Sequence, residues 1–276
     1  MVWWLALFQV AQAGAWTRAP DSYYAKLGAD GYWAMNWDQV GSSATSQDRF
    51  LGQQYGVFAE VGLPTPHPMQ ISVNAPLSVG TLWFRRVSAG QAAEGSATVT
   101  RLGDLRVMPQ VALHRKAPVA AAVEVKLPMY NVDSICAATP EWALLCPRPG
   151  DGQLDVTGWL LGGMPVGSKG FGEAAVGYIH RSGIGVGGPA AYDPADGLTW
   201  LMTGGLRTGQ VWWMVKGDGV VTLMDDGLTG YAGRVGPSMM WDVAERWSFE
   251  ARSQVDVYAR NTARGLSFGV GVSSRR

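Results

Sequence analysis

The sequence predicts an all-β protein: a single closed antiparallel transmembrane β-barrel of about twelve strands in up-and-down order. Three observations support this prediction. Segments of about ten residues repeatedly alternate apolar and polar side chains, which is the period of a strand. Their length suits a tilted strand that crosses a bilayer. The connections alternate between long and short, as external loops and periplasmic turns do in outer-membrane barrels.

The alternation is clearest in residues 247–258. Odd positions there are mainly apolar, as at Phe249 and Val255, and even positions are polar, as at Glu250 and Arg252. A helix, with its period of 3.6 residues, could not sort these side chains onto two faces. This stretch is therefore predicted as a strand with one apolar and one charged face.

The same pattern defines the strands along the whole chain. In order, they cover residues 22–34, 49–61, 69–86, 104–114, 119–127, 154–165, 171–181, 198–207, 210–216, 229–241, 247–258 and 264–273. Small residues dominate 88–101, and Gly and Asp punctuate 217–227, so both segments are predicted as loops.

The N-terminus carries the one long apolar run. Residues 2–13 are too few for a membrane-spanning helix, which needs roughly 20 residues. They suit the core of a signal peptide, with Ala11-Gln12-Ala13 as its cleavage site. We therefore expect residues 1–13 to be a signal peptide and 14–276 to be the barrel domain. The run has no Lys or Arg before it, so a buried first strand is the alternative.

Composition narrows the functional classes. Charged residues make up 16% of the 276 residues, and the 22 basic side chains equal the 22 acidic ones. This balance predicts no nucleic-acid partner and no basic membrane-surface patch. The two cysteines, Cys136 and Cys146, lie in a Pro-rich segment without a nearby His, so a loop disulfide is favoured over a metal site. Two free thiols are the alternative.

Alternation alone does not say which face meets which solvent. The apolar faces are too extensive for one soluble core and rarely carry charge. Aromatic residues lie near predicted strand ends, as interfacial girdles do: Tyr23, Trp33, Trp83, Trp241 and Trp247. We therefore expect the apolar faces to contact lipid in the outer membrane of a Gram-negative bacterium, and the polar faces to line a lumen.

The predicted lumen face collects equal numbers of basic and acidic residues. The basic ones are Lys26, Arg106, Lys126, Arg181, Arg207, Lys216, Arg234 and Arg252, and the acidic ones are Asp30, Glu60, Asp104, Glu124, Asp155, Glu173, Glu250 and Asp256. Buried charges need partners, so ion pairs between neighbouring strands are expected. Such a network either fills a closed lumen or lines a narrow polar path, and twelve strands fit both interpretations.

One part of the chain has a recognisable counterpart. Residues 103–107, Gly-Asp-Leu-Arg-Val, and 123–128, Val-Glu-Val-Lys-Leu-Pro, form a strand–turn–strand pattern. It resembles the outer-membrane barrels of the phenol meta-cleavage pathway family and similar transporters. The matching segment is about a tenth of the chain, and the rest is similar in layout. The resemblance implies passive uptake of small aromatic or other hydrophobic solutes. We expect a porin-like channel without cofactor, metal or covalent chemistry.

One motif suggests an enzyme instead. His180 and Ser182 are two residues apart on a predicted strand and so share its face. The pair is similar to the His-x-Ser of outer-membrane phospholipase A and lipid A deacylases, in which the His activates the Ser. Gly183 stands where those enzymes have an Asn. A lipid hydrolase is therefore one alternative to a channel, and a closed structural or surface-display barrel is another.

Overall fold

The computed structural model describes residues 15–37, 49–88, 91–114, 117–130, 152–185, 188–189, 195–224, 231–260 and 263–276. The predicted signal peptide, residues 1–13, lies outside these ranges. So does the predicted disulfide between Cys136 and Cys146. Both remain predictions. No helix in the described part of the chain is long and apolar enough to span a membrane.

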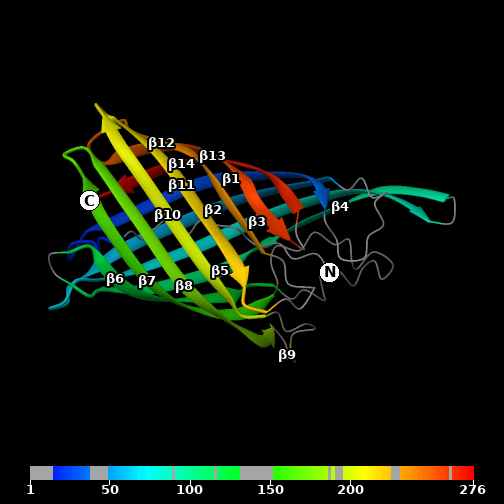
Figure 1. Ribbon diagram of the computed structural model, residues 1–276, viewed down its shortest axis with the longest axis horizontal. Coiled ribbons are helices and arrows are strands. Elements are labelled where there is room, and N and C mark those ends of the chain that lie inside the picture. Colours follow the sequence, from blue (N-terminus) through cyan, green and yellow to red (C-terminus); the bar gives the residue numbers. More distant parts are fainter. Residues whose placement is uncertain are drawn as a thin grey trace.

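Twelve antiparallel strands close into one barrel (Figure 1). They are β1 (Tyr23–Trp37), β2 (Arg49–Leu63), β3 (Met69–Ser88), β5 (Asp104–Ala112), β6 (Val119–Pro128), β7 (Gln153–Val166), β8 (Gly170–Gly185), β10 (Gly197–Thr208), β11 (Val211–Thr222), β12 (Tyr231–Asp242), β13 (Trp247–Arg260) and β14 (Ala263–Arg275). Neighbours in the chain pair with one another, and β14 pairs with β1. The pairing of β8 with β10 completes the ring. The predicted fold class, strand number and order are confirmed.

The two ends of the barrel differ in their connections. Tight turns join β7 to β8 and β10 to β11, and each contains a glycine with a left-handed backbone, Gly167 at φ 60° and Gly209 at φ 61°. A side chain with a Cβ atom would be strained in this conformation. The C-terminus lies at the same end, where Arg276 and Tyr23 exchange backbone hydrogen bonds of 3.0 and 3.3 Å. We call this the short-turn end and the opposite one the long-loop end.

Two predicted loops are partly strand. Residues 91–102 form β4 (Gln91–Leu102), which pairs with the distal half of β3 and extends as a hairpin from the long-loop end (Figure 1). The hydroxyl groups of Thr81 and Thr98 lie 3.0 Å apart across it. Strand β11 also continues to Thr222, although 217–227 reads as a loop. Within the described residues, the two-residue strand β9 (Gly188–Pro189) pairs with the end of β8.

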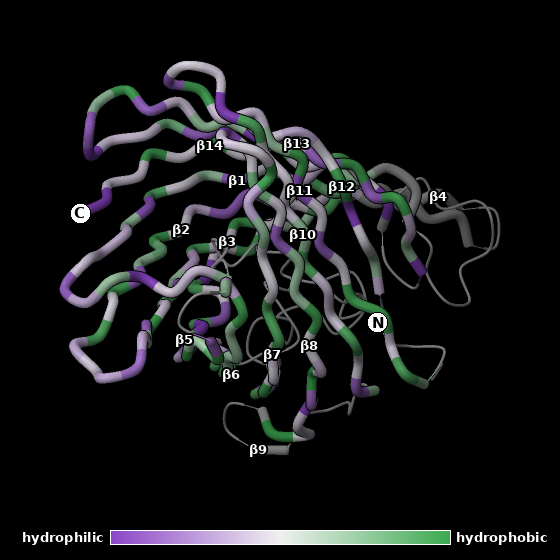
Figure 2. Tube along the Cα trace, turned by 60° about the vertical axis from the view of Figure 1, so that its left-hand side comes forward, coloured by the Kyte–Doolittle hydropathy of each residue, from purple (hydrophilic) through white to green (hydrophobic). Residues whose placement is uncertain are grey.

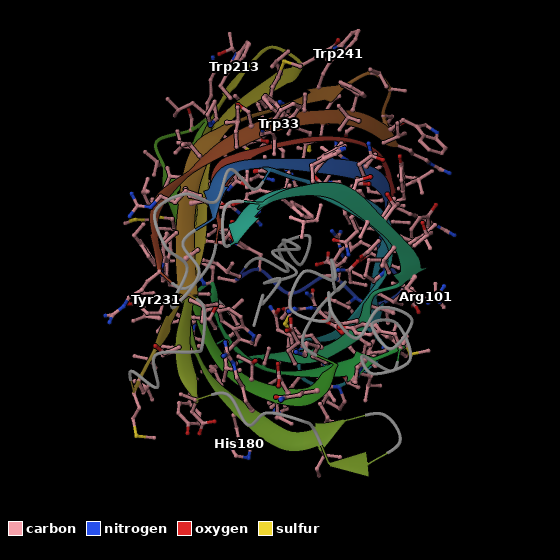
Figure 3. All side chains as sticks on the ribbon, turned by 90° about the vertical axis from the view of Figure 1, so that its right-hand side faces the viewer. Trp33, Arg101, His180, Trp213, Tyr231 and Trp241 are labelled. Atoms are coloured by element: carbon pink, nitrogen blue, oxygen red, sulfur yellow. The ribbon has the colours of Figure 1, made fainter. Side chains whose placement is uncertain are left out.

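The outer face of the barrel is apolar. Hydropathy alternates along the strands in Figure 2, and the apolar members are the exposed ones, such as Leu27, Val215 and Val270 at 64%, 50% and 51% exposure. In Figure 3, viewed along the barrel, Trp213 and Trp241 project outward. A soluble monomer rarely exposes so extensive an apolar surface to water, whereas the lipid-facing surface of a membrane barrel must be apolar.

The spacing of the outer aromatics matches a bilayer. Tyr23 and Trp33 stand ten residues apart on β1, and both side chains are exposed on the outer face. At about 3.3 Å per residue and a tilt of about 40°, they are roughly 25 Å apart along the membrane normal. This is about the height of the apolar band of an outer-membrane barrel.

One local irregularity reverses the alternation. The β12–β13 register shifts between Gly233 and Arg234, so that Arg234 pairs with Asp256 and Gly233 pairs with Tyr258. The Tyr258 hydroxyl then accepts a hydrogen bond of 3.0 Å from the indole N–H of Trp200, whose neighbours Leu198 and Met202 on the same face of β10 are exposed. The β-bulge therefore places Tyr258 on the outer face, although its even position predicts the polar face.

Candidate transport lumen

The strands turn their polar side chains inward, where most are buried. The residues less than 9% exposed include Gln54, Glu60, Gln70, Asn74, Asp104, Gln110, Glu124, Lys126, Asp155, Arg181, Asp218, Arg234, Glu250 and Gln254. Twelve strands spaced by about 4.8 Å and tilted by about 40° enclose a backbone ring roughly 24 Å across. Side chains from opposite walls therefore leave a narrow space between them, and the inner wall decides what fits there.

A shared carboxylate lies at the centre of the charged wall, which β1 and β11–β14 form. The Glu250 carboxylate accepts a hydrogen bond from Lys26 Nζ at 2.5 Å on one oxygen and from Lys216 Nζ at 2.7 Å on the other. Ser238 Oγ donates to it at 3.3 Å. Two lysines and one carboxylate leave this cluster one positive charge in excess, within a site that is largely shielded from solvent.

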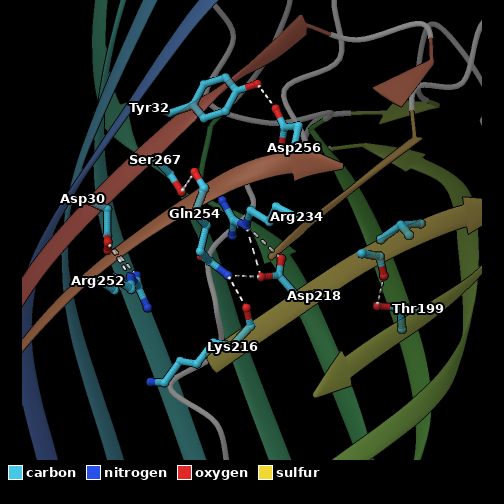
Figure 4. A network of polar contacts seen from close by, with 12 residues as sticks. Asp30, Tyr32, Thr199, Lys216, Asp218, Arg234, Arg252, Gln254, Asp256 and Ser267 are labelled. Carbon is cyan, nitrogen blue, oxygen red and sulfur yellow. Dashed lines mark hydrogen bonds and ion pairs between the residues drawn. The ribbon is translucent and has the colours of Figure 1, made fainter. Parts of the chain in front are cut away.

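Two further ion pairs continue this wall toward the long-loop end (Figure 4). The Arg252 guanidinium donates to Asp30 Oδ1 at 2.5 and 3.0 Å. Arg234 Nε donates to both oxygens of Asp218 at 3.0 and 3.1 Å, and the Gln254 amide donates to Asp218 at 3.2 Å. Each charge thus has a partner of opposite sign, which offsets the cost of removing it from water.

Glycines on the inner face of β14 make room for two of these pairs. Lys26 and Asp30 lie on β1, and Glu250 and Arg252 on β13, so each pair must span the intervening strand. A Cβ atom at Gly271 would lie 2.6 Å from Lys26 Cε. One at Gly269 would lie 2.6 Å from Arg252 Nε. The charge network therefore requires a glycine at both positions.

The other predicted charges are spread around the ring. Arg106 pairs with Glu124 at 2.8 Å and Lys126 with Asp155 at 2.5 Å, both between neighbouring strands. Asp256 accepts hydrogen bonds from Tyr32 Oη at 2.6 Å and from the backbone of Gly265 at 2.7 Å. Asp104 is buried, Glu173 is half-buried on β8, and Arg207 is exposed at the short-turn end, 3.3 Å from Asp242.

Three charged partners are absent from the predicted set. Asp218 lies in a segment predicted as a loop, and Asp242 follows a predicted strand end. Arg18 precedes the first predicted strand, and its guanidinium pairs with Glu60 at 2.7 Å. No alternation marks these positions, so the sequence pattern could not have found them. The one available signal is indirect: buried charges on the lumen face need partners of opposite sign, and these three residues supply them.

The wall across the lumen from this network is apolar. One cluster joins inward-facing residues of β2, β5, β6 and β7 with partly buried ones of β8 and β10: Phe58, Met108, Ala120, Ala122, Trp159, Leu161, Ala175 and Leu201. The lumen is therefore two-sided: the charge network lies on β1 and β11–β14, and the hydrocarbon cluster lies opposite it, nearer the short-turn end than the ion pairs Arg106–Glu124 and Lys126–Asp155 on the same strands. We call this cluster the apolar wall.

A short N-terminal segment covers the apolar wall at the short-turn end. Ala15 belongs to the cluster, and the Trp16 ring contacts Phe171 edge-on at a centroid distance of 6.3 Å. The Arg18 guanidinium lies 5.0 Å from the centre of the Tyr24 ring, which adds a cation–π contact to its ion pair. This segment narrows the lumen where β1 begins.

His180 and Ser182 do not form a catalytic pair. His180 is on the outer face, where its Nδ1 lies 3.3 Å from Asp196 Oδ2, while the Ser182 hydroxyl donates to the Leu154 carbonyl at 2.5 Å. Within the described residues no hydrogen bond links His180 to Ser182. The arrangement therefore does not favour the lipid-hydrolase alternative.

Asp196 organises a polar cluster at the long-loop end. Its carboxylate also accepts hydrogen bonds from the Tyr178 hydroxyl and from the backbone N–H of Arg181, the latter at 2.9 Å. Burial alone would raise the pKa of Asp196, but these hydrogen bonds and the one from His180 outweigh it and lower the pKa. The described residues contain no group of three or more potential metal ligands.

The closed barrel, its apolar exterior and its charged interior define a bacterial outer-membrane β-barrel. In fold, the chain is similar to an outer membrane channel from Pseudomonas putida F1, with 11% identity, a TM-score of 0.70, and coverage of 96% of this chain and 99% of that one. It is also similar to the CymD monoaromatic hydrocarbon channel, with 5% identity, a TM-score of 0.50, and coverage of 94% and 89%.

A third similar structure is the transport unit of the autotransporter AIDA-I from Escherichia coli, with 6% identity, a TM-score of 0.52, and coverage of 93% and 91%. At these identities the likeness concerns the fold. No protein-family model and no curated protein sequence matches the chain.

Proposed function

We propose that this protein is a passive outer-membrane channel for small solutes with a hydrophobic, aromatic body. The single observation that carries the proposal is the two-sided lumen. A purely structural barrel can be filled by charge networks or by hydrocarbon alone. Here a charged wall faces an apolar one, and a solute with an apolar ring and a hydrated edge complements both.

The inner surface suits transit rather than tight binding. A channel must bind its solute well enough to admit it and weakly enough to release it. The ion pairs of the charged wall, Lys26 with Glu250 and Asp30 with Arg252 among them, leave little net charge to trap a solute. Burial of an aromatic ring against the apolar wall contributes about 25 cal/mol per Å² of apolar surface. No covalent step is required.

The similar structures agree with this function. The channel from Pseudomonas putida F1 covers the same length of chain as this protein, and CymD is a monoaromatic hydrocarbon channel. We propose that the predicted lumen residues, from Lys26 and Asp30 on β1 to Glu250 and Arg252 on β13, line the solute path.

A matched pair of variants tests this path. Ala122 faces the lumen at 6% exposure, and its neighbour Val123 faces outward at 47% exposure. In planar bilayers the wild-type protein should conduct KCl, and an aromatic solute such as benzyl alcohol should interrupt the current. Ala122→Trp should reduce the conductance severalfold, whereas Val123→Trp should not change it.

Folding of each variant is checked by its heat-dependent mobility on a gel, and Ala122→Leu replaces Ala122→Trp if the latter does not fold. A wild-type protein that conducts nothing would refute the channel. Equal conductance of the two tryptophan variants would show that the current does not pass along this wall.

A further inference from the structure

Among the described residues, two hydrogen-bond donors on the inner wall of β7 and β8 have no acceptor. They are the indole Nε1–H of Trp159 and the Nε–H of Arg181, on side chains only 9% and 8% exposed. A buried donor without an acceptor costs about 1–3 kcal/mol, and a charged one costs more. Two such groups on neighbouring strands of one wall therefore point to a ligand.

Trp159 offers its ring to the lumen as well as its N–H. It pairs across the ladder with Gly177, and a Cβ atom at Gly177 would lie 2.9 Å from both Cδ2 and Cε3 of the indole. The ring therefore lies over the backbone of Gly177. Any other residue at this position would place its Cβ atom against the ring. Ala122 and Leu161 surround it with hydrocarbon. The result is an aromatic platform with one polar edge.

Arg181 lacks the acidic partner that its neighbours have. The carboxylate opposite it on β7 is Asp155, which pairs with Lys126 at 2.5 Å. The Asp196 carboxylate contacts the backbone N–H of Arg181. In the described part of the chain no carboxylate forms an ion pair with this guanidinium. A guanidinium that is nine-tenths buried and has no ion pair within the described residues favours the arrival of an anion.

The two groups stand in sequence along the path. Arg181 is four residues beyond Gly177 on β8, toward the long-loop end. This is about 13 Å along the strand and roughly 10 Å along the barrel axis. A solute from outside therefore meets the guanidinium first and the aromatic platform next.

We propose that the β7–β8 wall binds small aromatic carboxylates at two successive contacts, with Arg181 receiving the carboxylate first and Trp159 then receiving the ring. The inference rests on the proposed channel function and names a preferred solute class for it. A guanidinium binds both oxygens of a carboxylate with its planar fork. A hydrocarbon would leave the Arg181 guanidinium without an anion, and an inorganic anion would leave the Trp159 platform unused.

Equilibrium binding to the detergent-solubilised full chain tests the site, with benzoate, benzyl alcohol and chloride as probes. Arg181→Gln should weaken benzoate binding at least tenfold and change benzyl alcohol binding less than twofold. Trp159→Ala should weaken both about fivefold, since both lose the platform. Arg101→Gln, which removes the same charge from the exposed β4 hairpin, should change neither.

Arg181→Lys keeps the cation if Arg181→Gln does not fold, and it should retain benzoate binding within a factor of about five. Benzoate binding that is equal in wild type and Arg181→Gln would overturn the proposal. So would chloride that competes as well as benzoate, because the ring would then contribute nothing. A protein that conducts KCl but binds no benzoate would overturn this site and leave the channel standing. Binding without conductance would uphold the site and refute the channel.

Discussion

The outward orientation of the apolar faces predicts a specific penalty for charge in the middle of the barrel. Leu27 is 64% exposed on β1, four residues from Tyr23 at the short-turn girdle. At about 3.3 Å per residue and a tilt of about 40°, it lies roughly 10 Å above that girdle, close to the midplane of a band about 25 Å tall. Leu27→Arg would place a guanidinium there.

At the midplane an arginine on the lipid face costs about 2–4 kcal/mol, and near the interface about 0–1 kcal/mol. Leu206 provides the matched interfacial control, because it is 57% exposed and pairs with Trp213 in the short-turn girdle. Leu27→Arg should therefore lower the free energy of unfolding in lipid vesicles by about 3 kcal/mol, and Leu206→Arg by less than about 1 kcal/mol.

Urea titration of vesicle-embedded protein, followed by tryptophan fluorescence, measures both values. If water rather than lipid covered the outer face, each substitution would be an ordinary surface change of about 0.5 kcal/mol or less. Two small and equal values would therefore refute the orientation on which the channel depends.

Three other perturbations probe the charge network and the outer rim. Glu250→Gln should leave its two lysines without a carboxylate, which should cost about 3 kcal/mol of stability and shift the reversal potential toward anion selectivity. Gly271→Ala should displace a lysine and cost about 1–2 kcal/mol, whereas Gly31→Ala, where a Cβ atom meets nothing within 4 Å, should be close to neutral in urea titrations. The lowered pKa of Asp196 means that its carboxylate should stabilise the rim above the ordinary aspartate pKa and lose this effect as the pH falls through the folded pKa. Asp196→Asn should therefore remove the pH dependence of the hydrogen-exchange protection factors around His180, after correction for the intrinsic exchange rate.

Much of this fold follows from alternation because lipid and lumen demand opposite side chains. Alternation of apolar and polar residues does not identify strands where lipid and lumen no longer lie on opposite faces. The β4 hairpin extends beyond the long-loop end and carries small residues without alternation, so its sequence is typical of a loop. Gly217 and Gly219 flank Asp218 and resemble a turn, although β11 continues through them. The β-bulge that reverses Tyr258 leaves no mark in the sequence.

The inner wall was predictable only in part. Glu250 and Arg252 stand out because a charge on an apolar strand must face inward. Trp159 and Leu161 do not stand out, because β7 is apolar on both faces from residue 158 onward, and alternation cannot then show which face is the inner one. The ion pairs over β14 depend on which strands meet when the barrel closes. That contact joins the two ends of the chain and has no local signal.

The glycines of β14 also affect how the molecule assembles. This strand lies between β1 and β13, and two ion pairs pass over its glycines Gly269 and Gly271. Where the barrel closes, the ion pairs therefore connect β13 directly to β1 across β14. Until the ring closes, these charged side chains are exposed to water, where salt screens their attraction more than it weakens backbone hydrogen bonds. We expect the final sealing step of barrel insertion to slow as ionic strength rises, while the earlier hairpins form at an unchanged rate.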